Sequence, residues 1–347
     1  MPRLTLTLVT AALLALPALA AAAPYDALYV FGDSLSDRGN LADAFGTSFP
    51  NPPSYHNSFT NGDVAIARVA AAYGLADDPS LWLSSPTPTN PLTGTSYAVG
   101  GATAQASAVG GIADINLPQQ ISAYLAQSGG TADTGALYTL FIGGNDVTHA
   151  TMTMTDEPAI TAAVSSELNA ITQLKAAGAR NFLVVNVPDV GSIPLFAQEH
   201  PDLAGEASTL TTLYNQDLAS GLATVSGVNL VSFNLFTYEK AILANAARFG
   251  ITDTADFCYT NAPFSAATTA ACGAGAANIG HFAYWNDVHP TKQVHALIAK
   301  GIEQALAGVR SPSPVPEPAI WALLVGGFGM IGGTLRRGRE RIAASEA

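Results

Sequence analysis

A serine near the start of the chain stands where its surroundings could make it a nucleophile. Ser34 lies in the stretch 29–40, where an apolar, β-prone run stops at Gly32 and the serine follows two residues later. This pattern places a hydroxyl at the carboxyl end of a buried strand, where open α/β sheets keep their active sites. Asp33 or Ser34 capping a helix is the simpler interpretation, and this stretch alone does not separate the two.

Three further segments carry the other groups that acyl transfer needs. Gly100 lies in a glycine-rich stretch whose backbone N–H groups could approach a ligand closely, and Asn145 offers a side-chain amide donor. His289 lies just ahead of the expected final helix, and an imidazole can take a hydroxyl proton and return it to a leaving alcohol. Preorganised N–H donors stabilise the tetrahedral oxyanion. Together the four segments predict an acyl-transfer site.

Alternating strands and helices position these segments. Five short apolar runs predict strands, at residues 27–31, 95–99, 137–142, 182–187 and 228–233. Helical spacing falls between them, at residues 64–73, 158–177, 209–222 and 238–249. Asp63 is expected to cap the first of these helices, and His295 is expected on the final helix. The alternation predicts a three-layer α/β/α sandwich with about five parallel strands in flavodoxin-like order.

Composition and charge exclude several classes of function. The 347-residue chain has a formal net charge of −12, which disfavours a nucleic-acid partner or an anionic membrane surface. Two cysteines without clustered histidines do not make a zinc site, so we expect no metal and no cofactor. Residues 24–310 are long enough for one large α/β domain, which we expect to be a monomer.

The two ends of the chain have the features of sorting signals. Residues 1–23 combine a positive start, an apolar core and a small-residue cleavage site, which predicts a cleaved secretion signal. Residues 311–318 are rich in proline, and an apolar run at 319–335 is followed by four arginines, which predicts a short transmembrane helix. A permanent single-pass anchor is the alternative interpretation of this tail.

The tail of residues 311–347, with Val-Pro-Glu-Pro-Ala, an apolar run and arginines in that order, resembles the PEP-CTERM sorting signal of Gram-negative bacteria. The resemblance implies a transient anchor in the inner membrane, processing by a sorting machinery, and release to the cell surface or extracellular matrix. In that oxidising compartment Cys258 and Cys272 are expected to form a disulfide that staples a loop. Such a bond contributes perhaps ~3 kcal/mol in the chain-entropy account.

The four segments with chemical groups, taken together and in order, resemble the SGNH hydrolases, also called GDSL esterases and lipases. The resemblance spans residue 27 to about residue 305 and extends to the stretches 186–191 and 213–218. It implies a role for each group: nucleophile Ser34, base His289, and oxyanion donors Ser34, Gly100 and Asn145.

One departure from the family pattern concerns the residue that orients the histidine. The family usually has Asp three residues before the histidine, and here that position is Asn286, with Asp287 one residue later. An asparagine carbonyl could fix the tautomer of His289 without stabilising an imidazolium by charge. Alternatively Asp287 takes over the role, or the enzyme is weakened or inactive. The family spacing favours Asn286.

The sequence therefore predicts an exported serine esterase or lipase that acts on a small-molecule, lipid or acylated-sugar ester. O-deacetylation of a surface polysaccharide is an alternative reaction, suggested by the sorting tail. A non-catalytic matrix or binding protein on the same fold is the alternative from another class, which Asn286 favours and the retained Ser34 and His289 oppose.

Overall fold

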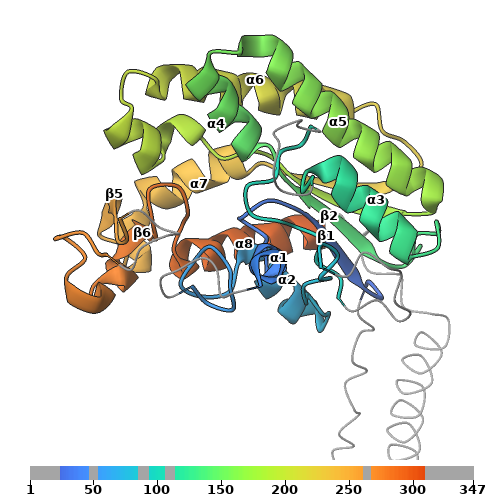
Figure 1. Ribbon diagram of the computed structural model, residues 1–347, viewed down its shortest axis with the longest axis horizontal. Coiled ribbons are helices and arrows are strands. Elements are labelled where there is room, and N and C mark those ends of the chain that lie inside the picture. Colours follow the sequence, from blue (N-terminus) through green and yellow to red (C-terminus); the bar gives the residue numbers. More distant parts are fainter. Residues whose placement is uncertain (1–23, 47–53, 85–93, 106–113, 261–266, 309–347) are drawn as a thin grey trace, which may run out of the picture.

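The computed structural model describes residues 24–46, 54–84, 94–105, 114–260 and 267–308 (Figure 1). The expected secretion signal and sorting tail lie outside these residues. Within the described part of the chain, no helix combines the length and apolarity that crossing a bilayer requires.

A parallel sheet of four strands forms the centre of the fold. It consists, in spatial order, of β1 (Leu28–Gly32), β2 (Leu137–Phe141), β3 (Asn181–Val185) and β4 (Asn229–Phe233). The register places Gly32 opposite Phe141, and Phe141 opposite Val185. All four carboxyl ends therefore meet at one edge, and the segments that follow the strands lie side by side there.

The predicted strand at residues 95–99 is present only as a short pairing beside β1. Ser96 forms a parallel bridge with Val30, and the N–H of Tyr97 donates to the carbonyl of Val30 at 2.7 Å. This segment lies on the side of β1 that faces away from β2. The order from residues 95–99 through β1 to β4 is the flavodoxin-like order that the sequence predicts.

Helices cover both faces of the sheet and complete three layers (Figure 1). One layer packs together α3 (Leu117–Gln127), α4 (Gly144–Thr153), α5 (Asp156–Ala177) and α6 (Ala204–Leu222). The other contains α1 (Asn40–Phe45), α2 (Ala65–Tyr73), α7 (Leu235–Ala244) and α8 (Lys292–Gly308), with α8 packed on α2, α7 and β4. Short helical turns stand at Val190–Ser192, Leu195–Glu199, Ala246–Phe249, Ala274–Ala276 and Ile279–His281.

The expectation that Asp63 caps α2 is wrong. The residue before the helix is Val64, which makes no side-chain cap, and the carboxylate of Asp63 instead lies 3.4 Å from the guanidinium of Arg38. The helix ends at Tyr73, the last residue of the expected range. The carboxylate of Asp63 thus pairs with the guanidinium of Arg38 and does not bind the free N–H groups at the start of α2.

A second, small sheet leads to the histidine segment. Its two parallel strands are β5 (Asp253–Phe257) and β6 (Phe282–Tyr284), and the N–H of Tyr259 donates to the carbonyl of Trp285 at 3.0 Å. In Figure 1 this sheet lies at one end of the molecule, beside α7. It brings the segment after β6 over the carboxyl edge of the main sheet.

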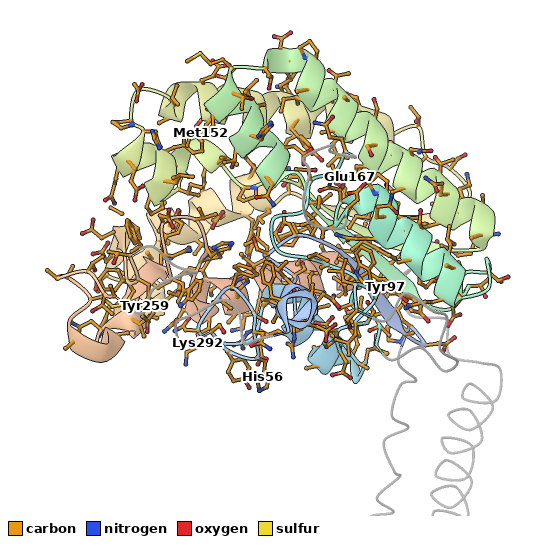
Figure 2. The ribbon with its side chains drawn as sticks, in the orientation of Figure 1. His56, Tyr97, Met152, Glu167, Tyr259 and Lys292 are labelled. Carbon is orange, nitrogen blue, oxygen red and sulfur yellow. A yellow bond between two sulfur atoms is a disulfide. The ribbon has the colours of Figure 1, made fainter. Side chains whose placement is uncertain are left out.

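The core lies between the layers and also contains polar side chains. Tyr97 and Glu167 are fully buried, whereas Met152 and His56 lie at the periphery (Figure 2). The hydroxyl of Tyr214 donates to Glu167 at 2.7 Å, so the carboxyl is partly satisfied in the interior. Burial raises the pKa of Glu167 to about 8 because an apolar surrounding disfavours the charged form.

Both ends of the described domain lie away from the carboxyl edge of the sheet. The strand β1 begins at Leu28 and runs toward Ser34. The helix α8 begins three residues after His289 and runs for 17 residues to Gly308, or about 25 Å at 1.5 Å per residue. The first strand and the last helix therefore have their free ends far from the two candidate catalytic residues.

Candidate active site

Ser34 and His289 meet at the carboxyl edge of the sheet, although 255 residues separate them. The Nε2 atom of His289 lies 2.7 Å from the Oγ atom of Ser34. Both side chains are 8% exposed, so a small ligand can reach them while bulk water is largely excluded. The geometry is that of a nucleophile beside its general base.

Asn286 orients the imidazole of His289. Its Oδ1 atom lies 3.0 Å from Nδ1 of His289, and it also accepts the backbone N–H groups of Val288 at 3.1 Å and His289 at 2.6 Å. Two backbone donors require an oxygen at this position, which fixes the amide orientation. A carbonyl oxygen has no hydrogen, so Nδ1 must carry the proton and Nε2 presents its lone pair to Ser34.

Packing holds the imidazole in this orientation and keeps it neutral. The ring of Phe59 lies 5.1 Å from that of His289 between centroids, and the ring of Trp285 lies at 6.2 Å. Burial lowers the pKa of His289 to about 3, because the charged form is disfavoured away from water. The free base form is therefore present throughout the neutral range.

Asp287, the other candidate for the orienting role, is turned to a different part of the structure. Its backbone carbonyl accepts the N–H of Leu195 at 2.9 Å. Burial and the nearby Glu199 raise the pKa of its carboxyl to about 6. Of the two expected candidates, Asn286 is the one whose side-chain oxygen is in hydrogen-bond contact with His289.

The N–H of Gly100 donates to Asp37, which corrects the oxyanion-donor role expected for Gly100. One carboxylate oxygen of Asp37 accepts the N–H of Gly100 at 2.8 Å, and the other accepts those of Gly39 at 2.7 Å and Asn40 at 2.8 Å. An N–H held by a buried carboxylate is not available to an oxyanion. The sequence does not predict this correctly because backbone direction is not encoded in residue type.

Gly101 is the next backbone donor along the same loop. Its neighbours are engaged: the N–H of Ala102 donates to Val99, that of Thr103 to Asn116, and that of Ala104 to Asp146. The N–H of Gly101 donates to no acceptor among the described residues, and its φ of 82° lies in the left-handed region that favours glycine. This loop thus offers one free N–H beside the catalytic edge.

Asn145 is placed on the first turn of α4, immediately after β2. Its Nδ2 atom donates to the carbonyl of Ala102 at 2.8 Å, which ties it to the glycine loop. An amide nitrogen carries two hydrogens, so one remains for a ligand. The turn depends on Gly143, whose φ is 111° and where an added Cβ would lie 2.5 Å from the ring of Tyr214.

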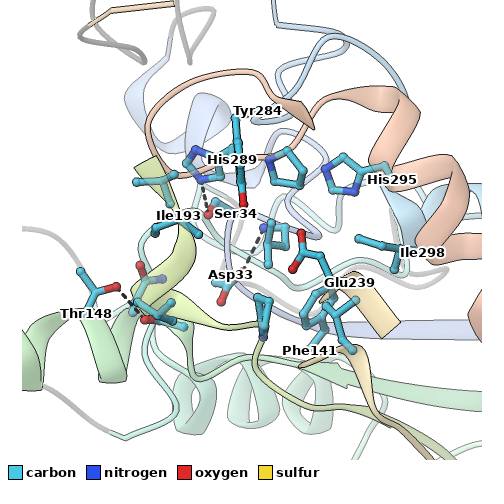
Figure 3. A pocket seen from close by; sticks show the side chains of 18 residues that line it. Asp33, Ser34, Phe141, Thr148, Ile193, Glu239, Tyr284, His289, His295 and Ile298 are labelled. Carbon is cyan, nitrogen blue, oxygen red and sulfur yellow. Dashed lines mark hydrogen bonds between the residues drawn. The ribbon is translucent and has the colours of Figure 1, made fainter. Parts of the chain in front are cut away.

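One cavity contains Ser34, Asn145 and His289 in its wall (Figure 3). Its walls come from the segments after β1, β2 and β3 and from α7, α8 and the histidine loop. Most of the lining is apolar, and the main apolar contributors are Leu35, Phe141, Pro188, Val190, Ile193, Leu235, Val288 and Ile298. The space is small, about 50 Å³.

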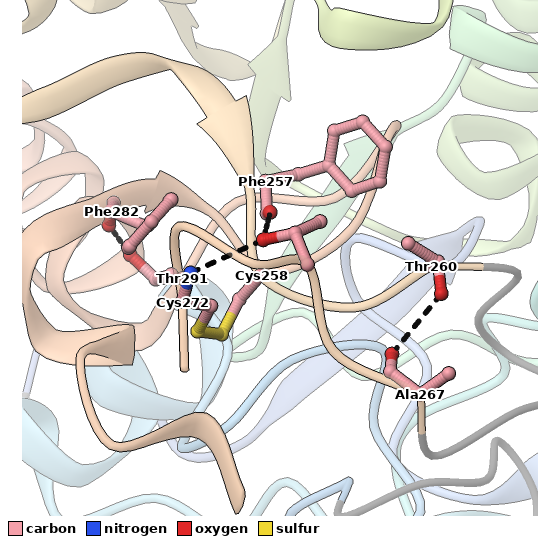
Figure 4. Close-up of a disulfide and its surroundings, with 8 residues drawn as sticks. Phe257, Cys258, Thr260, Ala267, Cys272, Phe282 and Thr291 are labelled. Carbon is pink, nitrogen blue, oxygen red and sulfur yellow. Dashed lines mark hydrogen bonds between the residues drawn. A yellow bond between two sulfur atoms is a disulfide. The ribbon is translucent and has the colours of Figure 1, made fainter. Parts of the chain in front are cut away.

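Cys258 and Cys272 form a disulfide close to the histidine segment (Figure 4). Their Cα atoms are 5.0 Å apart, and both side chains are fully buried. Thr269 ties the same loop down through its N–H to the carbonyl of Cys258 and its hydroxyl to that of Phe257, each at 2.9 Å. The bond therefore closes the loop that continues from β5 toward β6 and His289.

His295 and Glu239 also line the cavity, although no role was expected for either. The sequence indicates that His295 is buried, because it lies three residues before Ile298 and four before Ala299, on the apolar stripe of α8. No comparable signal marks Glu239 on α7. Within the described residues, no group of histidine, cysteine and carboxylate side chains could hold a metal ion.

Comparison with known proteins gives a match over most of the chain. Residues 28–302 match the family model described as GDSL-like Lipase/Acylhydrolase. Lipase 1 of Photorhabdus luminescens is 32% identical over 62% of this chain and 29% of its own length. Esterase EstA of Pseudomonas aeruginosa is 30% identical over 86% of this chain and 50% of its own length.

The chain spans less than two thirds of the length of each of the first three curated relatives. Among solved structures, an acetyl xylan esterase from Geobacillus stearothermophilus is similar with a TM-score of 0.41 at 11% identity, covering 82% of this chain and 96% of that one.

Proposed function

Because the chain belongs to the GDSL-like lipase/acylhydrolase family, we propose that it is a serine esterase that hydrolyses carboxylic esters through an acyl-enzyme on Ser34. The observation that carries this proposal is the 2.7 Å contact between His289 Nε2 and Ser34 Oγ. The tautomer that Asn286 fixes leaves Nε2 unprotonated, which is the form that a general base requires.

The reaction proceeds in two steps. Oγ of Ser34 attacks the ester carbonyl while Nε2 of His289 takes the hydroxyl proton. The tetrahedral intermediate then collapses, the bond to the alkoxy oxygen breaks, and His289 gives its proton to the leaving alcohol. Water enters, loses a proton to the same nitrogen, and attacks the acyl carbon. The second collapse releases the acid and restores the serine hydroxyl.

Three N–H donors are suited to hold the oxyanion. They are the backbone N–H groups of Ser34 and Gly101 and the second hydrogen of the Asn145 amide. Gly101 takes the place expected for Gly100, whose N–H already donates to Asp37. Each such donor is worth roughly 10²–10³ in rate where this has been tested.

The catalytic group of Ser34, His289 and Asn286 has no formal charge at rest. A neutral amide orients the imidazole but stabilises the imidazolium of the transition state less than a carboxylate would. We therefore expect ester hydrolysis with a modest turnover number. This feature also favours the second candidate function, a binding protein on the same fold that does not turn over its ligand.

Ester turnover by the purified protein separates the two functions. We expect hydrolysis of 4-nitrophenyl acetate and butyrate by the native protein, and loss of all but trace activity in Ser34→Ala with an unchanged melting temperature. Ser122→Ala, an exposed serine on α3, is the matched control and should behave as the native protein. A folded native protein that hydrolyses no ester in a panel including lysophospholipids and acetylated sugars would favour the binding function.

We also propose that the protein is exported and sorted through its tail. The support is the signal-like pattern of residues 1–23 and the PEP-CTERM-like pattern of residues 311–347. Cell fractionation of a Gram-negative host that has the sorting machinery should find a chain that lacks residues 1–23 but keeps its tail in the inner membrane, and a chain that has also lost the tail outside it. A chain that stays in the cytoplasm would contradict this proposal.

A further inference from the structure

The cavity at Ser34 continues inward to a polar end that ester hydrolysis does not use. There its lining includes Phe141 on β2, Glu239 on α7, and His295 and Ile298 on α8 (Figure 3). Leu235 on α7 also lines the cavity. Apart from the partly buried Glu239, none of these is more than 2% exposed. This inner arm of the cavity therefore lies between the sheet and two helices, and of these wall residues Glu239 alone reaches solvent in part.

His295 presents a hydrogen-bond donor at this end. Its Nδ1 atom accepts the N–H of Ala65 at 3.1 Å, so the other ring nitrogen, Nε2, must carry the hydrogen of the neutral imidazole. Burial lowers the pKa of His295 to about 3, which keeps the ring neutral. The buried Nε2 has no acceptor among the described residues. A buried donor without an acceptor is costly, so a ligand atom that accepts from Nε2 would be bound favourably here.

Glu239 lies across the same space and provides the complementary group. Its neighbour on α7, Lys240, is committed elsewhere and contacts Asp189 at 2.8 Å. Burial and the charge of Asp189 raise the pKa of Glu239 to about 7, so at neutral pH its carboxyl can accept a hydrogen bond and a fraction can also donate one. Glu239 and His295 thus offer an acceptor and a donor to the same guest.

We propose that this polar end binds a hydroxyl group on the acyl part of the substrate, so that the enzyme prefers short hydroxyacyl esters to unsubstituted esters of equal length. The inference rests on the proposed esterase function. The hydroxyl oxygen accepts from Nε2–H of His295, and the hydroxyl hydrogen points to the carboxyl of Glu239. A hydroxyl satisfies both groups at once, whereas a methyl group satisfies neither.

The order of the reaction steps and the size of the cavity assign the inner arm to the acyl group rather than to the alcohol. The alcohol must leave while the acyl group is still bonded to Ser34, and an arm whose walls are largely buried is a poor exit for it. The cavity volume of about 50 Å³ corresponds to only a few water-sized spheres, which limits the guest to a few carbon atoms. A long fatty acyl chain does not fit this space.

The test compares two nitrophenyl esters of one chain length, 4-nitrophenyl 3-hydroxybutyrate, each enantiomer separately, and 4-nitrophenyl butyrate. Their ratio of kcat/KM, corrected for the ratio of their alkaline hydrolysis rates, is measured for the native protein. It is then measured for His295→Asn, whose oxygen can still accept from Ala65 but whose side chain stops short of the cavity, and for Glu239→Leu. Lys300→Ala, on the exposed side of α8, is the matched control.

We expect the native protein and Lys300→Ala to prefer one enantiomer of the hydroxy ester by about 10-fold or more, and the preference to fall toward 1 in His295→Asn and Glu239→Leu. If both esters are hydrolysed in a Ser34-dependent way at a native ratio near 1, the polar end does not select a hydroxyl and the inference is wrong while the esterase function stands. If neither ester is hydrolysed, the function and the inference fail together. Since the native ratio decides, a variant that does not fold leaves the test intact.

Discussion

The segment of Ser34 and the loop of His289 meet at 2.7 Å, but different interactions hold them. Ser34 follows a central strand, and the backbone around it is fixed by Asp37, whose carboxylate accepts N–H groups of the next turn and of the glycine loop. His289 lies outside the main sheet, on a loop after β6. That loop is fixed by Asn286, by a backbone bond from Trp285 N–H to the His289 carbonyl at 2.7 Å, and by the disulfide next to it.

The difference shows how one site can combine a charged and a neutral support. A buried carboxylate that accepts several N–H groups makes the nucleophile side rigid at little electrostatic cost to the reaction, because Asp37 does not touch Nδ1 of His289. The base side uses an uncharged amide, which positions the ring without a fixed negative charge beside it. Damage to the first support should therefore act through folding, and damage to the second through catalysis.

The largest effect is expected for Asn286→Ala. It removes the acceptor of His289 Nδ1 and of two backbone N–H groups, so the imidazole loses both its tautomer and its orientation. We expect kcat to fall by roughly 10²–10⁴, since a wrongly held imidazole cost about 10⁴ in a serine protease. Steady-state kinetics on a short-chain ester would measure the loss.

Asp287→Ala is the matched control for that variant and should stay within a few-fold of the native rate. A severe loss in Asp287→Ala with near-native turnover in Asn286→Ala would reverse the assignment of the orienting residue. The nucleophile side and the base side would then each be held by a carboxylate.

Asp37→Asn should reduce stability more than it changes the chemical step. The amide cannot replace both carboxylate oxygens, so at least one buried N–H loses its acceptor, at a cost of roughly 1–3 kcal/mol for each group left unpaired. Urea unfolding would measure the loss. Asp133→Asn is the control, because within the described ranges that exposed carboxylate accepts a single N–H, that of Gly135 in a turn. Equal stability of both variants would show that Asp37 does not support the nucleophile side.

Removing the disulfide should reduce the stability of the protein and disturb the base side of the site. Replacement of Cys258 and Cys272 by serine opens a loop with a sequence separation of 14, and about 3 kcal/mol of stability should be lost in the chain-entropy account. Activity should fall as well, because the loop leads into the His289 segment. Reductant should destabilise the native protein to the same degree and leave the double variant unchanged. A native protein that is indifferent to reductant would contradict the role of the bond.

The smallest effect is a shift in pH dependence for Asn286→Asp. Burial lowers the pKa of His289 to about 3, and a carboxylate beside Nδ1 would favour the imidazolium and raise that pKa. Because the base must be unprotonated, activity of the native protein should persist to lower pH than that of the variant. The acid limb of kcat/KM should move upward by about one pH unit or more, with an equal or higher rate at neutral pH. An unchanged limb would show that the new carboxyl does not ionise beside His289.

The strands and the catalytic segments could be predicted because they depend on residue type. Continuous apolar runs mark buried parallel strands, and β1 to β4 each begin and end within two residues of the predicted positions. Side chains that carry their own chemistry, such as those of Ser34 and His289, are visible in the sequence. Their contact across 255 residues also depends on the small second sheet, which brings the loop after β6 to the carboxyl edge of the main sheet.

What the sequence did not predict depends on backbone direction and on polar segments. The choice between Gly100 and Gly101 is decided by which N–H points at Asp37, and two adjacent glycines give no pattern that separates them. The strand β5, Asp-Thr-Ala-Asp-Phe, is largely polar and partly exposed, so it lacks the apolar run that marks the others. The role of Glu239 depends on where α7 packs, which no local pattern indicates.

The placement of the two ends of the domain determines how the protein can be attached to something else. Leu28 begins a strand that points toward the catalytic edge, and α8 ends about 25 Å of helix away from its start near His289. A tether at either end, whether to a bead, a carrier domain or a matrix polymer, would therefore attach to the side of the molecule away from Ser34 and His289. The edge with Ser34 and His289 would lie on the opposite side of the domain, so immobilisation through either end should leave it accessible to macromolecular esters.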